Sequence, residues 1–160
     1  MRIRPLVAVL LLAGIVPLGC EDDDDPAGPA TSFAAVMTGA SESPPVTTSA
    51  TGTATFQVDG ASIDYTLTTT GLTNVTAAHI HGPAQPGENA GIIVGLFIQQ
   101  TEGDWPGNKT ATFDVADFTQ GQSVTTMAAL LDLMRTGGAY VNFHTTENPA
   151  GAIRGQILPN

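Results

Sequence analysis

Residues 51–69 read TGTATFQVDGASIDYTLTT, and this stretch decides the fold class. Every second residue of its latter half is apolar: Ile63, Tyr65 and Leu67. That period places one face of a strand on a core and the other in water. Asp59 and Gly60 between the two halves are a typical hairpin turn pair. We therefore predict a β-hairpin with strands at 51–59 and 62–69.

A similar composition continues on both sides of the hairpin, from residue 31 to the end of the chain. Short segments rich in Thr and Val and poor in charge are separated by Gly, Pro, Asn and Asp. This pattern is typical of a sandwich or barrel built from many short strands. Further strands are predicted at 31–39, 75–81, 91–98, 109–115, 139–145 and 152–158. The predicted fold class is all-β, a Greek-key-like β-sandwich of about eight strands.

Only one segment favours a helix, near residues 123–136. Apolar residues recur there at spacings of three and four: Val124, Met127, Leu131 and Met134. Gly137 follows as a C-terminal stop signal. We expect a short helical segment whose Met and Leu stripe packs on the sandwich, because such a stripe is usually core material.

The first 19 residues are typical of a signal peptide. Arg2 and Arg4 form a basic start, and an apolar run at 6–16 follows, too short for a membrane-spanning helix. Gly19 directly before Cys20 resembles a bacterial lipobox, in which the cysteine is acylated. Cys20 is also the only cysteine of the chain, so a disulfide framework is excluded. We expect cleavage after residue 19 and lipidation of Cys20, which attaches the protein to a membrane.

An acidic tether is predicted to connect the lipid to the domain, at residues 20–30. It contains the run Glu21, Asp22, Asp23, Asp24 and Asp25 and has no apolar periodicity. After removal of residues 1–19, three basic residues stand against 15 acidic ones, a net charge of −12. Nucleic acid is therefore excluded as a partner, since phosphate requires a basic face.

Four motifs lie in the predicted domain at 31–160. They are AAHIHGPA at 77–84, GIIV at 91–94, GAYVNFHT at 138–145 and NPAGAIRGQI at 148–157. Together they resemble the CHRD (chordin-type) domain, and Glu42 with Pro44 and Pro45 resembles an E-x-P-P segment of that family. The resemblance covers about residues 33–158. It implies an extracellular location and a β fold, and it implies no established reaction.

All three histidines of the chain lie in these motifs. His79 and His81 are two residues apart on a predicted strand, so both side chains leave the same face. If the strand at 139–145 brings His144 beside them, three imidazoles bind Zn²⁺ or Cu²⁺ and leave one coordination position open. The alternative is that the histidines are neutral hydrogen-bonding residues that fix the packing together with Tyr140, Asn142 and Thr145.

The other motif residues are assigned structural positions: Asn148, Arg154 and Gln156. Alternation places Arg154 and Gln156 on the outward face of the last strand. We expect a solvated edge there, with Arg154 paired to Glu147 or another acid. Trp105, the only tryptophan, lies in a predicted loop and is expected to fold back over the rim of the core.

The sequence favours a binding or structural module over an enzyme. It contains no Gly-x-Ser-x-Gly elbow, no phosphate-binding loop and no catalytic cysteine, so no residue is assigned a catalytic role. We expect an exported lipoprotein of the cell envelope, anchored to a membrane and binding an extracytoplasmic protein partner without a cofactor. The alternative function is a metal-binding or redox module with Zn or Cu on the three histidines.

Overall fold

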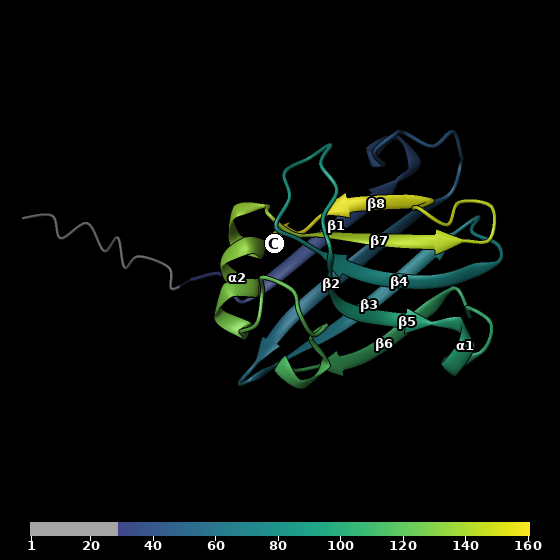
Figure 1. Ribbon diagram of the computed structural model, residues 1–160. Helices are drawn as coiled ribbons and strands as arrows, with labels where there is room; N and C mark the ends of the chain where they lie inside the picture. The colour runs from purple at the N-terminus through teal and green to yellow at the C-terminus, as the bar shows by residue number, and fades with distance from the viewer. Residues whose placement is uncertain (1–28) are drawn as a thin grey trace, which may run out of the picture.

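The computed structural model describes residues 29–160 and is mostly β (Figure 1). The predicted signal peptide, Cys20 and nearly all of the acidic tether lie outside the described residues. The strands are β1 (Ser32–Thr38), β2 (Thr51–Asp59), β3 (Ser62–Thr70), β4 (Val75–His81), β5 (Ile92–Ile98), β6 (Asn108–Phe113), β7 (Tyr140–Thr145), β8 (Ile153–Gln156) and β9 (Leu158–Pro159). The predicted all-β class is confirmed, and each of the predicted strands is present with small shifts of its ends.

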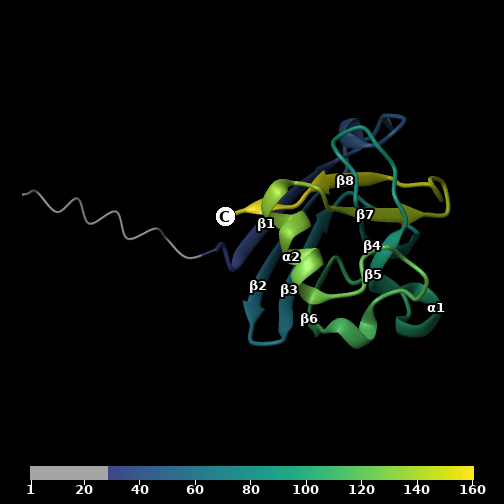
Figure 2. The ribbon, with the colours of Figure 1, turned by 60° about the vertical axis from the view of Figure 1, so that its left-hand side comes forward.

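The strands of this region form an antiparallel sheet with the order β5-β4-β7-β8-β1-β2-β3-β6, and β9 pairs with β1. The sheet curls, so that its two end strands, β5 and β6, come to lie near each other (Figures 1 and 2). Two side chains from β3 and β6 bind the backbone of β5 across this closure. Tyr65 Oη on β3 and Lys109 Nζ on β6 both donate to the carbonyl oxygen of Leu96 on β5, each at 2.8 Å. The two layers of the expected sandwich are therefore the two halves of a continuous sheet.

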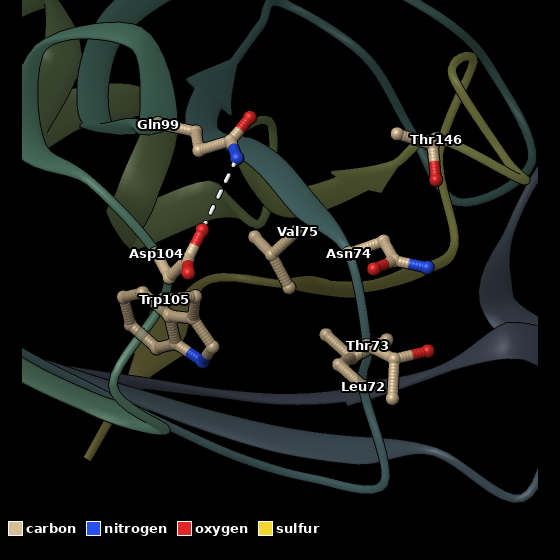
Figure 3. Close-up of a pocket in the computed structure, with 8 residues that line it drawn as sticks. All are labelled: Leu72, Thr73, Asn74, Val75, Gln99, Asp104, Trp105 and Thr146. Atoms are coloured by element: carbon tan, nitrogen blue, oxygen red, sulfur yellow. Dashed lines mark hydrogen bonds between the residues drawn. The ribbon is translucent and has the colours of Figure 1, made fainter.

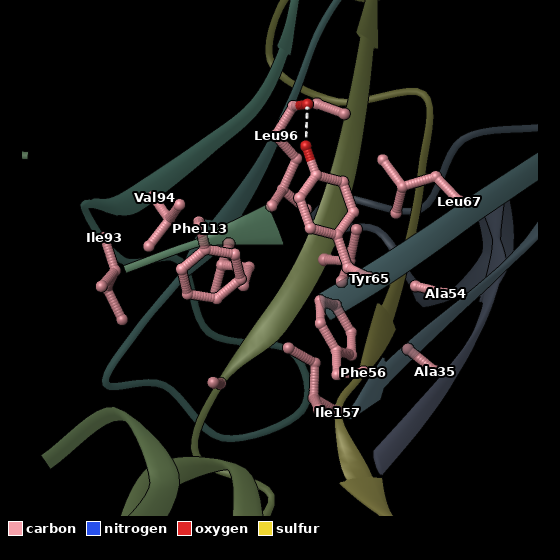
Figure 4. Packing of buried hydrophobic residues seen from close by; sticks show 14 of the residues in the cluster. Ala35, Ala54, Phe56, Tyr65, Leu67, Ile93, Val94, Leu96, Phe113 and Ile157 are labelled. Atoms are coloured by element: carbon pink, nitrogen blue, oxygen red, sulfur yellow. Dashed lines mark hydrogen bonds between the residues drawn. The ribbon is translucent and has the colours of Figure 1, made fainter. Parts of the chain in front are cut away.

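The core fills the space inside this curl, as Figure 4 shows for the part around Tyr65 and Phe113. The hairpin of β2 and β3 explains how the sequence directs its own residues inward. Its register runs from Thr51↔Thr70 to Asp59↔Ser62, with Gly60 in the left-handed region at φ 59°. Ile63, Tyr65 and Leu67 are buried, as the alternation predicts.

The predicted helical segment is α2 (Met127–Thr136), which begins four residues later than expected. Thr126 Oγ1 accepts from the backbone N–H of Ala129 at 3.2 Å, and this N-cap fixes the start. Gly137, at φ 68°, ends the helix as predicted. The helix packs through Leu130 and Met134, whereas Leu131, expected in the buried stripe, is only half-buried.

Three further one-turn segments complete the described fold: η1 (Gly39–Ser41), α1 (Gln99–Glu102) and η2 (Val115–Asp117). The η2 turn shortens β6 relative to the predicted strand. Asp114 Oδ1 accepts from the N–H of Ala116 at 2.6 Å, and Asp117 Oδ2 accepts from the N–H of Asp114 at 3.0 Å. This capping box ends the strand at Phe113. No helix among residues 29–160 is long and apolar enough to span a membrane.

Candidate metal centre

Strands β4 and β7 bring the three histidines together. The ring centroids of His79 and His81 are 5.5 Å apart, those of His79 and His144 are 4.9 Å apart, and those of His81 and His144 are 5.9 Å apart. One ring nitrogen of each lies within 4.8 Å of the other two. His144 therefore does lie beside the His-x-His pair, which is the arrangement that the metal hypothesis requires.

The pairing register explains this placement. Residues directly opposite each other in an antiparallel pair carry their side chains on the same face. In the β4–β7 pair Ala77 lies opposite His144, His79 opposite Asn142 and His81 opposite Tyr140. The intervening residues Ala78, Ile80, Val141 and Phe143 fill the core. The histidines thus occupy the other face of the sheet, yet His79 and His81 are only 9% and 7% exposed, and the loop that carries Ala90 contacts the ring of His81.

Hydrogen bonds to the backbone fix two of the imidazole rings. His81 Nδ1 lies 3.0 Å from the carbonyl oxygen of Ala90, and His144 Nδ1 lies 3.0 Å from that of Pro149. A carbonyl oxygen only accepts, so Nδ1 of each neutral ring donates and Nε2 carries the lone pair. Both Nε2 atoms are buried without a partner among the described residues, and so is Nδ1 of His79. Metal-binding histidines are commonly held in this way, with one nitrogen bonded to a carbonyl and the other free.

The surroundings keep the rings neutral at physiological pH. Burial lowers the pKa of His79 from 6.5 to about 4, with smaller contributions from the charges of His144 and His81. Burial also lowers the pKa of His81 to about 4, and the nearby charge of Arg154 adds to the effect. The pKa of His144 is lowered by burial as well, although its bond to Pro149 opposes the shift. Three neutral imidazoles can bind a metal ion without first losing protons.

Arg154, expected on a solvated edge, is one of the most buried side chains of the domain. It is 2% exposed, and β8 lies inside the sheet between β7 and β1. Its Nε donates to the carbonyl oxygen of Ser41 at 2.6 Å, and its Nη1 donates to Glu88 O and Asn89 Oδ1 at 2.9 and 3.0 Å. The expected pairing with Glu147 is wrong, since Glu147 accepts from Asn74 Nδ2. The segments that carry Ser41 and Glu88 cover this face of the sheet, so Arg154 is buried beneath them.

Glu42 is a buried acid that the sequence argument did not assign to the site. It is 6% exposed, and its Oε1 accepts from Asn142 Nδ2 at 2.8 Å. Burial raises the pKa of Glu42 to about 7, although the charge of Arg154 and two hydrogen bonds oppose the shift. The only signal for Glu42 in the sequence is its place in the E-x-P-P segment.

A family model identifies the domain. The model of the CHRD domain matches residues 33–157, which is most of the chain. The chain belongs to the CHRD domain family. The resemblance seen in the sequence motifs is thereby confirmed. No curated protein matches the sequence.

Tyr140, in the CHRD motif at 138–145, links the histidines to Arg154. The ring of Tyr140 stacks on His81, with centroids 5.0 Å apart and planes 7° from parallel. The guanidinium carbon of Arg154 lies over the Tyr140 ring, 4.6 Å from its centroid, within the range of a cation–π contact. Tyr140 Oη also accepts from the N–H of Ala90, whose carbonyl oxygen holds His81. The loop at 82–91 is therefore tied to both rings.

The remaining motif residues of the CHRD domain hold turns and loops. Thr145 Oγ1 accepts from the N–H of Asn148 at 3.0 Å, in the turn that carries Pro149. Gln156 Nε2 donates to the carbonyl oxygens of Ala84 and Gly137, both at 2.8 Å. These contacts fix the segments around the histidines, and they touch none of the free ring nitrogens.

Trp105 of the CHRD domain lies at the rim of the core, where it was expected. Its ring packs edge-on against Phe97 and Phe143, and its Nε1 donates to Thr69 Oγ1 at 2.8 Å. It lines an open cavity of about 380 Å³ (Figure 3) together with Leu72, Thr73, Asn74, Val75, Gln99, Asp104 and Thr146. This cavity contains none of the three histidines, so it is separate from the candidate metal centre.

Proposed function

We propose that this CHRD domain is an exported module that binds one transition-metal ion, Zn²⁺ or Cu²⁺, through His79, His81 and His144. It acts by binding rather than as an enzyme. One observation carries the proposal: one ring nitrogen of each histidine lies within 4.8 Å of the other two, and each histidine also has a buried ring nitrogen without a hydrogen-bond partner in residues 29–160. Three nitrogen ligands with a fourth position open are a known arrangement for both ions.

The alternative, a purely hydrogen-bonded histidine cluster, accounts less well for the same atoms. The neutral rings of His81 and His144 each donate their one N–H to a backbone carbonyl. Nε2 of each ring therefore has only a lone pair to offer. His79 has a single proton and can satisfy at most one of them. A buried polar atom without a partner costs about 1–3 kcal/mol. One metal ion would satisfy all three nitrogens at once.

The metal proposal is tested by metal analysis of the full-length protein after purification without chelators, followed by titration with Zn²⁺ and Cu²⁺. We expect one ion per chain and an increase in Tm. At 100 times Kd the gain is about 2.7 kcal/mol. The three histidines are the only ones in the chain, so a triple His→Ala variant removes every imidazole.

A matched control tests whether metal uptake comes from the acidic residues of the chain, since exposed carboxylates also bind cations weakly. The Asp114→Asn, Asp117→Asn variant removes two acids of η2 and should keep stoichiometric binding. A parent protein that takes up no stoichiometric Zn²⁺ or Cu²⁺, or a triple His→Ala variant that still does, would overturn the proposal.

The location of the module forms the second part of the proposal. Membership in the CHRD family supports an extracellular binding module. The Gly19-Cys20 junction and the acidic segment after it support a lipid anchor and a tether in front of β1. In a bacterial host, Cys20→Ser should move the protein from the membrane fraction to the soluble fraction. An unchanged distribution would contradict the anchor. An extracytoplasmic protein partner would then be sought by crosslinking at the membrane surface.

A further inference from the structure

Asn142 lies among the proposed metal ligands. It is directly opposite His79 in the β4–β7 pair and two residues before His144 on β7, so its side chain shares the face of both. Side chains directly opposite each other have Cβ atoms about 4.5–5.5 Å apart. Asn142 is 3% exposed, and its position is therefore inside the covered histidine cluster rather than at its edge.

The amide of Asn142 has one end bound and one end free. Its Nδ2 donates to Glu42 Oε1 at 2.8 Å, while its Oδ1 is buried without a partner among the described residues. In its ionised form Glu42 only accepts, and it then selects the orientation in which the amide nitrogen faces it and the oxygen faces away. The free oxygen thus joins the three free imidazole nitrogens as a fourth buried acceptor on this face.

Gly151 holds this orientation in place. Its backbone packs so closely that a Cβ there would lie 2.4 Å from Asn142 Nδ2 and 2.7 Å from both oxygens of Glu42. Its φ of 146° is also one that side chains disfavour. A glycine is therefore required where the turn between β7 and β8 closes over the Glu42–Asn142 pair.

We propose that Asn142 completes the metal centre. Its Oδ1 faces the coordination position that the three histidines leave open and accepts a hydrogen bond from a water molecule bound to the ion. Glu42 is the positioning residue that turns the amide. This inference rests on the proposed metal-binding function. It also predicts a selectivity of the centre. A divalent ion that keeps a bound water molecule should bind more tightly than a soft monovalent ion that keeps none.

The test uses two readouts that a merely structural role of Asn142 would not move. The first is the Zn²⁺ Kd from chelator competition, and the second is the visible spectrum of the Co²⁺-loaded protein, which reports coordination geometry. Loss of an outer hydrogen bond at a metal site typically weakens affinity by about 10–100-fold. We expect a loss of this size for Asn142→Ala, with an altered Co²⁺ spectrum. Glu42→Gln should give the same changes to a smaller degree, because glutamine offers both a donor and an acceptor and so no longer fixes which end of the Asn142 amide faces it.

Val141→Ala is the matched control. Val141 is the neighbour of Asn142 on β7, but it is fully buried in the core on the other face. Its truncation should lower stability and leave the Zn²⁺ Kd and the Co²⁺ spectrum unchanged. If Asn142→Ala binds Zn²⁺ as tightly as the parent with the parent's spectrum, Asn142 is not part of the centre, although the three-histidine site stands. If Asn142→Ala does not fold, an unchanged Kd and spectrum in Glu42→Gln overturns the inference. A parent that binds no metal refutes the proposed function itself.

Discussion

Replacing Arg154 with methionine should destabilise the domain severely. Methionine keeps an apolar stem of similar length but removes the charge and every donor. The acceptors on Ser41, Glu88 and Asn89 lose their donors, and the buried Glu42 loses the nearby positive charge that stabilises its ionised form. A hydrogen bond from a charged group contributes about 1.5–3 kcal/mol, and this substitution removes three of them. That is a large part of the roughly 5–15 kcal/mol by which a typical domain is stable.

Urea unfolding followed by fluorescence measures this loss directly, because Trp105 is the only tryptophan and packs against Phe97 and Phe143. Arg135→Met is the control. Arg135 forms a helix-surface pair with Asp132 at 3.0 Å, and its loss should cost less than about 1 kcal/mol. Combining Arg154→Met with Glu42→Gln should recover part of the loss, because the buried carboxylate of Glu42 is then removed as well. If Arg154→Met costs no more than the control, the structural role assigned to Arg154 is wrong.

Three further predictions concern pH, the closure of the sheet and its packing. The folded pKa of His79 and of His81 is about 4 against 6.5 for a free ring, so the unfolded chain binds more protons between these values. Metal-free protein should therefore lose up to about 3 kcal/mol per histidine as the pH falls from 6.5 to 4, measured by urea unfolding at a series of pH values. The raised pKa of Glu42 acts in the opposite direction, with stability lost as the pH rises from 4.5 to 7, and Glu42→Gln should abolish that part of the profile. Tyr65→Phe removes one hydrogen bond to Leu96 O while that of Lys109 remains, and should cost about 1 kcal/mol in the same assay; no loss would contradict the closure contact. Gly155→Ala places a Cβ 2.1 Å from Val36 O and should cost about 1–3 kcal/mol, whereas Gly95→Ala, with its nearest neighbour at 4.0 Å, should cost less; equal losses would refute the argument from close packing.

Local alternation was sufficient to predict the strands and the faces of their residues. Ile63, Tyr65 and Leu67 point inward as the period requires, and His79 and His81 share a face. Placing His144 beside them needed the register of β4 against β7, which no local pattern contains. The sequence left this placement as a condition, which the structure meets.

The burial of Arg154 could not be predicted in the same way. Alternation along β8 correctly places Arg154 on the face that points away from the core, because its neighbour Ile153 points into the core. It does not say what covers that face. The cover comes from the backbone of Ser41 and Glu88, which are distant from Arg154 in sequence. For the same reason Glu42 had no assigned role, because its partner Asn142 is 100 positions away.

The position of β8 between β7 and β1 determines when the proposed metal centre is complete. The strand that joins the histidine-bearing half of the sheet to the other half is made from residues 153–156, near the C-terminal end of the chain. A growing polypeptide that stops before this strand leaves the two halves unconnected and gives Tyr140 no Arg154 to pack under it. The proposed metal centre, with Arg154 over the ring of Tyr140, is therefore complete only when the whole domain has been made, and the ion it would bind is one that is present in the compartment where folding finishes.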